Sequence, residues 1–506
     1  MDVKHAMNLA GTNLLNCLNR EKDYLPNWEL RIAEDGTAHY QFQYPAHNIG
    51  RWWDAILRLE HLTGFEIPAD IEAAMLRNAY RFFDNPDGVL AQPVDLGIGE
   101  KTYELHSLRE GLIALTALIR FRDSSWARKK AKSFLQTVTR ALRDDFTWDM
   151  EQFATRRQIL GESYKGSFCV NGSHGRLIEA LVWHYQETAD TQAFDLASRL
   201  ARFHFESSTT PEGTINPVCK ADHTHSYFGT LRGLLLFGSL VGQREFIDRV
   251  LLMYHTTVKK LVKESGYTSH DMGYEGFGET SSGGDAAQMA LWLALEGHPE
   301  LLDDAERILR ARLLPSQITT TPPITPKVDD GRDCHRDLAA RAVGGFNVHG
   351  KPHGPKGNVT DVTAADLHSL CDMHDHTVVR NGSILKVLFH ANYHDRSVDI
   401  DEKRGREAQL IIRPHERYRL LVRIPAWTDR SALVARINEQ NIAPSYVDSV
   451  FLDAGTVRKG DSIEIRYALP ERTVVEPAMG TEYTLRWKGD EVTSISPNLD
   501  LLPFYP

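Results

Sequence analysis

The feature that most constrains the fold is an alternation of two kinds of helix-forming segment before about residue 372. Apolar residues recur at spacings of three and four, which predicts helices. Segments that are apolar on all sides are residues 48–64, 106–121, 174–190, 225–242 and 283–297. Segments with a charged outer face are residues 70–83, 127–144, 190–205, 244–264 and 303–314. The two kinds follow one another along the chain.

This alternation predicts an inner and an outer ring of helices. A helix that is apolar all round must be buried, whereas a helix with a charged face lies outside it. Roughly ten to twelve helices in such a repeat are typical of an (α/α)6 toroid, in which the starts of the inner helices meet in one funnel. Residues 315–362 are rich in Pro, Gly, Thr and His and predict a functional loop over that funnel. One more short helix is expected at 363–376.

The periodicity changes to two near residue 376. Alternating segments such as 383–393, 408–414, 418–427 and 461–469 predict strands separated by turns. Such a pattern is typical of an antiparallel β-sandwich, here packed on the toroid. We therefore expect a catalytic (α/α)6 domain over residues 1–375 and a β-sandwich domain over residues 376–506.

Composition excludes several classes of partner. The net charge of −10 leaves no basic surplus for nucleic acid. No apolar run reaches the roughly 18–20 residues of a membrane span, and the start lacks the apolar core of a signal peptide. The five cysteines are scattered and form no CxxC pair, which is typical of a reducing compartment. We expect a cytoplasmic protein without membrane or nucleic-acid partners, and a homodimer stays open.

Three histidines begin inner helices of the repeat. His106, His174 and His225 stand at equivalent points, so the toroid predicts that they line one pocket. Imidazole can donate to or accept from sugar hydroxyls, and it titrates near neutral pH. The alternative for each histidine is an ordinary hydrogen-bonded packing role. We expect all three to bind substrate.

A glycine-rich loop, "GYEGFGETSSGG" at residues 273–284, presents Glu275 and Glu279 just before an apolar helix. A solvated turn is one interpretation, and a catalytic carboxylate site is the other. The positive end of the following helix favours an ionised Glu279, which suits a base or a nucleophile. Aromatic side chains that could stack on a sugar, or else belong to the core, are Trp52, Tyr227 and Tyr274.

Several stretches resemble one enzyme family over most of the chain. They are "GSHGRLIEALVWHY", "THSYFGTLRGLLL", "GETSSGGDAAQMALW", "YRLLVRIPAW", "VRKGDSIEIRYALP" and "LRWKGDEVTSISP". With these stretches the sequence resembles the family 127 glycoside hydrolases, the β-L-arabinofuranosidase-like group. The resemblance implies an (α/α)6 barrel with a C-terminal β-sandwich, and it implies glycosidase activity on a carbohydrate substrate.

The sequence departs from that family at the metal centre. In the characterised members a glutamate and three cysteines hold zinc, and one cysteine is the nucleophile. The resemblance places the glutamate at Glu279, one cysteine at Ser281 and the adjacent cysteine pair near Asp361 and Val362. No thiolate remains at these positions, so we expect no zinc cofactor of this kind. Weaker metal-site candidates are His349, His353 and Asp361, and Ser281 is expected to bind substrate.

The remaining carboxyl groups could still cleave a glycosidic bond, since most glycosidases need two of them. We expect Glu279 and Asp361 to be this pair, with Glu275 in reserve. Asp361 is expected to be the protonated acid, in a dry setting between Val359 and Val362 that would raise its pKa.

Three functional classes stay open at this stage. The first is a glycoside hydrolase that removes a terminal sugar from an oligosaccharide or glycoconjugate. The second is a polysaccharide lyase or sugar isomerase, with His174 and Tyr227 as its proton-transfer residues. The third is a sugar-binding relative without catalysis. Only the products and a binding measurement separate the three.

Overall fold

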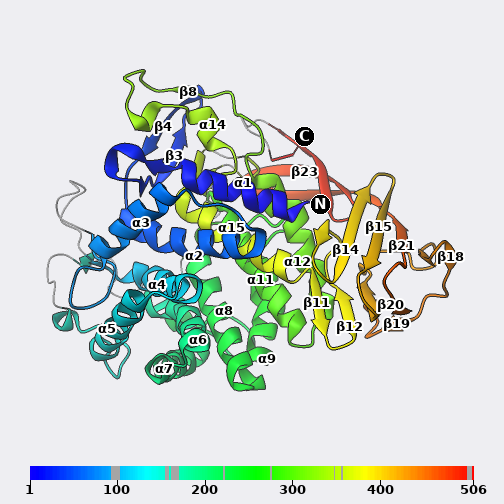
Figure 1. Cartoon of the computed structure of the whole chain (residues 1–506), viewed down its shortest axis with the longest axis horizontal. Coiled ribbons are helices and arrows are strands. Elements are labelled where there is room, and N and C mark those ends of the chain that lie inside the picture. The colour runs from blue at the N-terminus through cyan, green and yellow to red at the C-terminus, as the bar shows by residue number, and fades with distance from the viewer. Residues whose placement is uncertain are drawn as a thin grey trace.

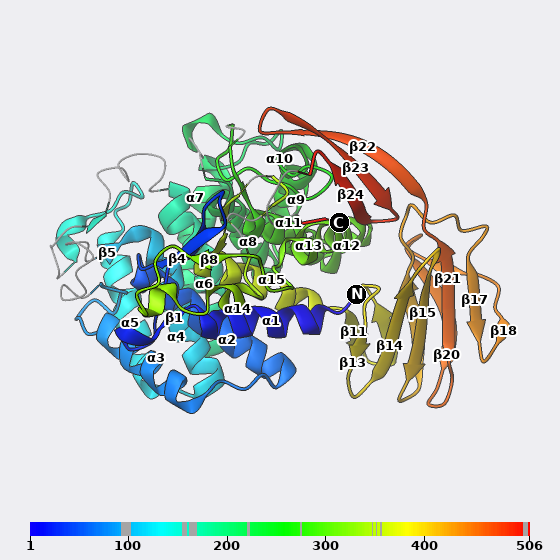
Figure 2. The ribbon, with the colours of Figure 1, turned by 90° about the horizontal axis from the view of Figure 1, so that it is seen from above.

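The structure is a computed structural model of the 506-residue chain. It describes residues 1–92, 103–153, 159–160, 170–219, 223–273, 276–346, 348–350, 352–354, 357–498 and 504–505. A helical body occupies one side of the molecule, and a strand-rich region lies at its end (Figure 1 and Figure 2). No helix among the described residues is both long and apolar enough to cross a membrane.

Six inner helices form a closed ring. They are α2 (Pro45–Thr63), α4 (Leu108–Arg122), α6 (Arg176–Thr188), α8 (Thr224–Val241), α11 (Thr280–Leu295) and α15 (Thr360–Asp375). Each packs against the next along the chain, and α15 packs against α2. The ring confirms the predicted (α/α)6 toroid. Its sixth member, α15, is the segment expected only as a further short helix.

The outer helices each cover an inner one. They are α3 (Ala69–Phe82), α5 (Ser125–Ala141), α7 (Thr191–Ser207), α9 (Arg244–Met253), α12 (Leu302–Ile308) and α1 (Val3–Asn16). The first five pack on the inner helix that precedes them, whereas α1 packs on α15 and α2. The N-terminal helix thus completes the outer ring beside the last inner helix.

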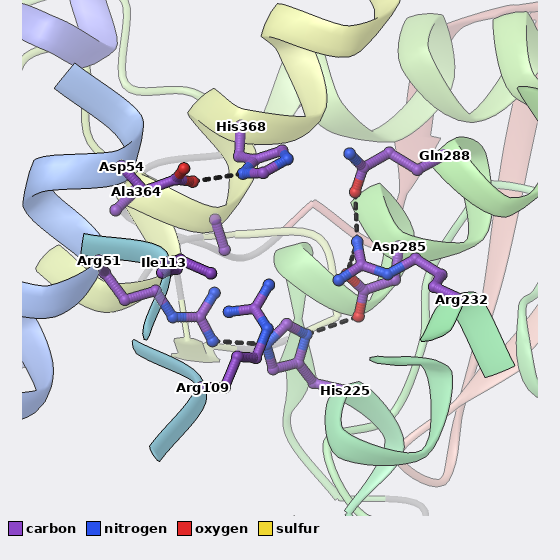
Figure 3. A pocket seen from close by; sticks show the side chains of 11 residues that line it. Arg51, Asp54, Arg109, Ile113, His225, Arg232, Asp285, Gln288, Ala364 and His368 are labelled. Atoms are coloured by element: carbon purple, nitrogen blue, oxygen red, sulfur yellow. Dashed lines mark hydrogen bonds and ion pairs between the residues drawn. The ribbon is translucent and has the colours of Figure 1, made fainter. Parts of the chain in front are cut away.

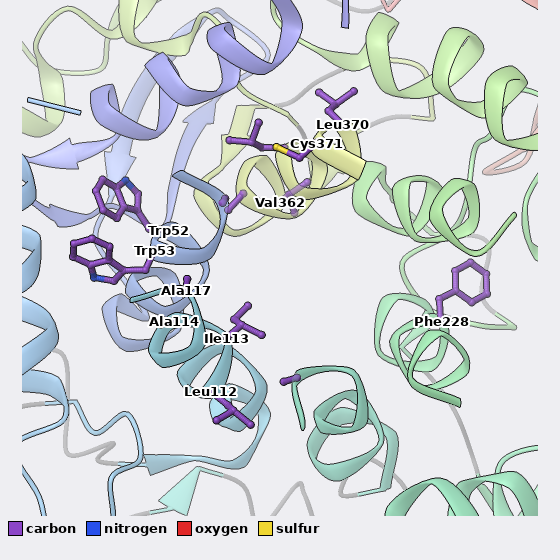
Figure 4. Close-up of a cluster of buried hydrophobic side chains, with 14 of the residues drawn as sticks. Trp52, Trp53, Leu112, Ile113, Ala114, Ala117, Phe228, Val362, Leu370 and Cys371 are labelled. Carbon is purple, nitrogen blue, oxygen red and sulfur yellow. The ribbon is translucent and has the colours of Figure 1, made fainter. Parts of the chain in front are cut away.

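The core of the toroid holds the bulkiest apolar side chains (Figure 4). Trp52 and Trp53 are 0% and 1% exposed and meet edge to face with ring centroids 5.1 Å apart. The indole Nε1 of Trp52 donates to the carbonyl of Leu14 at 3.1 Å. The expectation that Trp52 stacks on a sugar is therefore wrong, because the ring faces α1 and not the funnel.

Short strands occur in the helical part, between the segments that the periodicity predicted as helices. One sheet has the order β10-β3-β4-β8, formed by β3 (Glu29–Ile32), β4 (Thr37–Gln41), β8 (Thr325–Pro326) and β10 (Gly357–Val359). Two-stranded pairs are β1 (Leu18–Asn19) with β2 (Leu25–Pro26), and β5 (Tyr103–Glu104) with β6 (Ile159–Leu160). A third pair joins β7 (Gly278–Glu279) to β9 (Val348–Gly350). The long 315–362 segment therefore reaches the strand that carries Glu279.

After α15 the chain forms a β-sandwich. One sheet has the order β11-β12-β16-β20-β19, with β11 (Val378–Asn381), β12 (Ile384–Val387), β16 (Tyr418–Arg423), β20 (Phe451–Val457) and β19 (Tyr446–Val447). The other has the order β13-β14-β15-β21-β17-β18, with β13 (Tyr393–His394), β14 (Val398–Arg404), β15 (Glu407–Pro414), β21 (Ile463–Ala468), β17 (Val434–Ile437) and β18 (Gln440–Asn441). All neighbours are antiparallel except β12 and β16, which are parallel. One apolar cluster fills the space between the sheets.

A third sheet belongs to the toroid and not to the sandwich. It consists of β22 (Glu471–Ala478), β23 (Thr481–Lys488) and β24 (Glu491–Ser496). Its buried Leu485 and Trp487 share a core with Tyr267 and Ala311 of the helical part, and Figure 2 shows it running beside the helices. Residues 376–506 thus contain two separate sheet systems, which the change of periodicity did not distinguish.

Candidate active site

Polar side chains gather where the inner helices begin. The reason is geometric, since residues four apart lie on one face of a helix and helix starts converge at one end of a toroid. His47 and Arg51 are such a pair on α2, and His106 and Glu110 are the equivalent pair at the start of α4. Further members are Arg176 of α6, His223 and His225 at the start of α8, Glu279 before α11 and Asp361 in the first turn of α15.

Five imidazole rings form a contiguous group at this end of the toroid, where the inner helices begin, which we call the mouth. The ring of His47 stacks on that of His106 with centroids 5.4 Å apart and planes at 11°. The His106 ring lies 6.0 Å from that of His223. His223 in turn lies 6.0 Å from His225 and 4.5 Å from His270. The predicted His106 and His225 therefore belong to this group, together with three histidines that the repeat did not predict.

Asp361 lies between a guanidinium group and an imidazole ring. Its Oδ1 atom is 2.7 Å from Nε of Arg51 and 3.0 Å from Nε2 of His47. Burial opposes ionisation, but the charges of Arg51 and His47 and the hydrogen bond from His47 outweigh it, so the pKa of Asp361 lies well below its ordinary value. Asp361 is thus an ionised carboxylate. The expectation of a protonated acid in an apolar setting is wrong, because Arg51 reaches it from α2.

Glu279 faces imidazoles and a hydroxyl. Ser281 donates its hydroxyl to Oε1 at 2.6 Å, while Nε2 of His223 and Nε2 of His270 lie 3.4 Å and 4.0 Å from Oε2. Burial again opposes ionisation, but the hydrogen bond from His223 and the charges of His223, His225 and His270 lower the pKa of Glu279. The ionised form expected from the helix start is present, and these imidazoles stabilise it.

Below the mouth, arginines and carboxylates form a buried ionic layer (Figure 3). Glu110 is 0% exposed. Its Oε1 atom lies 2.5 Å from Nη2 of Arg176, 3.1 Å from Nη1 of Arg109 and 3.2 Å from Nε of Arg51. Arg232 lies between two carboxylates. Its Nη2 atom is 3.0 Å from Oε2 of Glu179, and its Nη1 atom is 2.8 Å from Oδ1 of Asp285.

The ionic layer is connected to the mouth through His225. Its Nδ1 lies 2.5 Å from Oδ2 of Asp285, and its Nε2 lies 2.7 Å from Nη2 of Arg51. A cavity of only about 10 Å³ remains between these side chains, which is the space of a single water molecule. The layer therefore closes the toroid beneath the mouth.

One buried carboxyl group, that of Asp366, has a raised pKa, in contrast to those of Asp361 and Glu279. Burial, followed by the charges of Asp285 and Glu279, raises the pKa of Asp366 well above its ordinary value, although Thr280 donates a hydrogen bond to it at 2.5 Å. Asp366 is 0% exposed and lies behind Thr280. Its burial therefore favours the protonated form.

Two further predicted residues point away from the mouth. His174 is 0% exposed, and its Nδ1 lies 2.9 Å from Nε2 of His204 on the outer helix α7. Its ring packs against Trp148 and Phe203. The predicted pocket role of His174 is wrong, because this histidine lies in a π-helical turn, Val170–Gly175, before α6 and faces the outer ring.

Tyr227 is the second of these residues. It follows His225 by two positions on α8, which places it on roughly the opposite side of the helix. Its side chain is 0% exposed, and its hydroxyl donates to the carbonyl of Ser208 at 2.8 Å. The expected sugar-stacking role is therefore wrong. Tyr274 and Glu275 lie outside the described residues.

Sequence reasoning missed several residues of the mouth. His47 precedes Asn48, the residue taken as the start of the first inner helix, and His223 precedes His225 by two positions. Both would have been found by examining the residues on either side of each helix start. His270 lies between the helices in a segment without periodicity, so no sequence signal indicated it.

The residues of this mouth do not match the cysteine-based zinc site of the family that the sequence resembles. At the position of one family cysteine, Ser281 donates a hydrogen bond to Glu279. At the position of the cysteine pair, Asp361 is engaged by Arg51 and His47. Cys371, the nearest cysteine in sequence, is buried in α15, where burial raises the pKa of its thiol. A tetrahedral thiolate site needs ligands that these residues do not supply.

Comparisons with known proteins support the fold. No protein-family model matches the chain, and no curated protein matches its sequence. Among solved structures, a GH127 β-L-arabinofuranosidase from Geobacillus stearothermophilus T6 has a TM-score of 0.58 at 12% identity, over 88% of this chain and 76% of that one. A GH127 β-arabinofuranosidase has a TM-score of 0.61 at 12% identity, over 96% of this chain and 78% of that one. The chain therefore has the fold of the GH127 β-L-arabinofuranosidases.

Proposed function

We propose that the protein is a glycoside hydrolase that removes a terminal sugar from an oligosaccharide or glycoconjugate at the mouth of the toroid. The observation that carries the proposal is a pair of ionised carboxylates, Asp361 and Glu279, which begin two adjacent inner helices among imidazoles and guanidinium groups. The buried ionic layer beneath them leaves a space of only about 10 Å³, which favours a substrate that ends at the mouth, such as the end of a sugar chain.

Asp361 is the carboxylate that we assign to attack or base catalysis. Its side chain is 13% exposed, compared with 4% for that of Glu279, so it is the more accessible of the two. Arg51 and His47 hold it ionised and in place, and both a nucleophile and a base need the ionised form. Whether configuration is retained depends on its distance from the acid.

We assign the proton donor to a third group, because the pKa values of both Asp361 and Glu279 are lowered by their neighbours. We assign this role to Glu275, which precedes Glu279 by four positions in the predicted catalytic loop. A donor variant has a diagnostic behaviour, since substrates with a good leaving group need little protonation. The variant Glu275→Gln should therefore lose far more activity on an alkyl glycoside than on a nitrophenyl glycoside.

The lyase or isomerase alternative assigned proton transfer to His174 and Tyr227, and neither side chain faces the mouth. His174 and Tyr227 both make buried hydrogen bonds on the outer side of the inner ring. The fold and the sequence resemblance both favour furanoside hydrolysis, so β-L-arabinofuranosides are the first substrates to test.

The test is a screen of nitrophenyl glycosides and natural oligosaccharides with the full-length chain. Release of nitrophenol and a new reducing end, abolished in Asp361→Asn, is the expected result. An unsaturated uronide with new ultraviolet absorbance would indicate a lyase instead. Sugar binding in calorimetry without any product, across the whole panel, would overturn the hydrolase proposal.

A further inference from the structure

We propose that His223, His270 and Glu279 bind a divalent transition-metal ion, with zinc as the probe. Among the residues that the structure describes, this is the group whose ligand atoms, two imidazole nitrogens and a carboxylate oxygen, all lie within 4.8 Å of one another. The proposal is independent of the proposed reaction, because its readout is bound metal.

The distances suit one shared ion. Nε2 of His223 lies 3.4 Å and Nε2 of His270 lies 4.0 Å from Oε2 of Glu279. Zinc bonds of about 2.0–2.2 Å in a tetrahedron place neighbouring ligand atoms about 3.3 Å apart. The nitrogen of His223 already has this spacing from Glu279. The nitrogen of His270 would have to move closer to Glu279 by less than about 1 Å.

Outer partners orient all three ligands. Nδ1 of His270 lies 2.7 Å from Oδ1 of Asp271, and a carboxylate only accepts, so Nδ1 carries a proton and Nε2 is the nitrogen that can bind a metal. Nδ1 of His223 has the Ser226 hydroxyl at 2.8 Å. The other oxygen of Glu279 accepts from Ser281. Metal-binding histidines almost always have such a second hydrogen bond, which fixes the tautomer and the ring.

The backbone also ties the three ligands together. The amide of Thr224, next to His223, donates to the carbonyl of His270 at 2.9 Å. The amide of His270 donates to the carbonyl of Phe277 at 3.0 Å, and that of Glu279 to the carbonyl of Thr268 at 3.2 Å. The site is therefore built on paired backbone segments, and it needs little ordering when an ion binds.

The charge environment separates this group from the ionic layer below it. Glu110 and Glu179 face arginines, whose guanidinium groups keep their protons and exclude a cation. Glu279 faces the Nε2 atoms of His223 and His270, which can act as metal ligands. The side chains of His223 and His270 are 13% and 25% exposed, so an ion can reach them from solvent.

The donor set indicates the class of metal. Imidazole nitrogen suits zinc, cobalt and related ions, whereas calcium and magnesium take oxygen ligands. Three protein ligands leave a coordination position for water or a sugar hydroxyl, as in catalytic zinc sites. This set shares only Glu279 with the cysteine-based site of the resembling family. It also departs from the expectation that the chain has no metal cofactor.

The experiment removes metal from the full-length protein with a chelator, adds zinc chloride or cobalt chloride, and measures metal content after dialysis. We expect one zinc per chain and an intense visible cobalt spectrum of four-coordinate geometry. His223→Ala and His270→Ala should weaken zinc binding by more than about 100-fold, since outer-partner changes alone cost about 10- to 100-fold. His298→Ala, a histidine beyond the far end of α11, is the matched control and should bind as the parent does.

A variant of an outer partner and a measurement of melting temperature accompany the metal analysis. Asp271→Asn retains all three ligands and should weaken zinc binding about 10- to 100-fold. Zinc should raise the melting temperature of the parent and of His298→Ala, and not that of His223→Ala. A parent that holds no zinc after dialysis, or ligand variants that bind it as tightly as the parent, would overturn the metal site. Sugar cleavage by a zinc-free chain would leave the hydrolase proposal intact, and zinc binding without any cleavage would leave the metal site intact.

Discussion

The Nε atom of Arg51 lies 2.7 Å from Oδ1 of Asp361, which joins the second turn of the first inner helix to the first turn of the last one. The same nitrogen lies 3.2 Å from Oε1 of Glu110 on α4. One guanidinium therefore connects the more accessible carboxylate of the mouth to the buried ionic layer. Its charge also lowers the pKa of the residue that we assign to catalysis.

Asp361→Asn should lower kcat/KM by about 100-fold or more, because the amide keeps the shape and loses the charge that a base or nucleophile needs. Turnover of the best substrate from the glycoside screen is the measurement. Asp375→Asn, an exposed carboxylate at the other end of the same helix, is the control and should retain full activity. Equal activity of the two variants would remove Asp361 from the mechanism.

Glu110→Gln should reduce the free energy of unfolding by about 3 kcal/mol or more, because it removes the charge of a carboxylate that faces several buried guanidinium groups. Three arginines face this carboxylate in a region closed to solvent. Urea denaturation followed by circular dichroism gives the value. Asp23→Asn breaks the exposed pair with Arg77, 2.7 Å apart, and should cost less than about 1 kcal/mol. Similar losses in both variants would mean that the ionic layer contributes little to stability.

Stability should fall on mild acidification because several histidines are buried in the neutral form. Burial lowers the pKa of His174 from 6.5 to about 3. The unfolded chain binds the proton first as the pH falls, so the stability that this histidine contributes is complete above pH 6.5 and is lost between about pH 6.5 and 3. The slope for one such group is about 1.4 kcal/mol per pH unit.

His174→Gln should therefore weaken the dependence of unfolding free energy on pH by one proton, measured by denaturant titrations from neutral pH to about pH 5. His5→Gln, at an exposed position of α1, is the control and should leave the dependence unchanged. The neighbouring His204 also has a lowered pKa and stays in both proteins. An unaltered slope in His174→Gln would show that this histidine is not buried in its neutral form.

Gly344→Ala should destabilise the protein by about 2 kcal/mol or more. Its φ of +89° disfavours any side chain, and a Cβ atom there would lie 2.0 Å from the carbonyl oxygen of Leu9 on α1. Gly382 has a φ of +57° and open space around it, so Gly382→Ala should cost only about 1 kcal/mol. Thermal unfolding of both variants tests the close approach of this loop to the outer ring.

The sequence determined the two-ring architecture because burial acts on whole helix faces. Segments such as 225–242 and 283–297 are apolar all round, and no arrangement leaves them in water. The position of Glu279 before α11 followed from the same pattern. The sheet that contains residues 29–41 did not, because these two strands pair not only with each other but also with strands near residues 357 and 325, far along the chain.

Only the tertiary structure decided which side chain at each helix start faces the axis. A shift of two residues, as between His225 and Tyr227, turns a side chain from the mouth to the outer ring. A π-helical turn has the same consequence for His174. The partners that hold Asp361 and Glu279 ionised come from other helices and from the irregular segment with His270. Periodicity encodes burial within one element, whereas charge pairing depends on distances between elements that only packing sets.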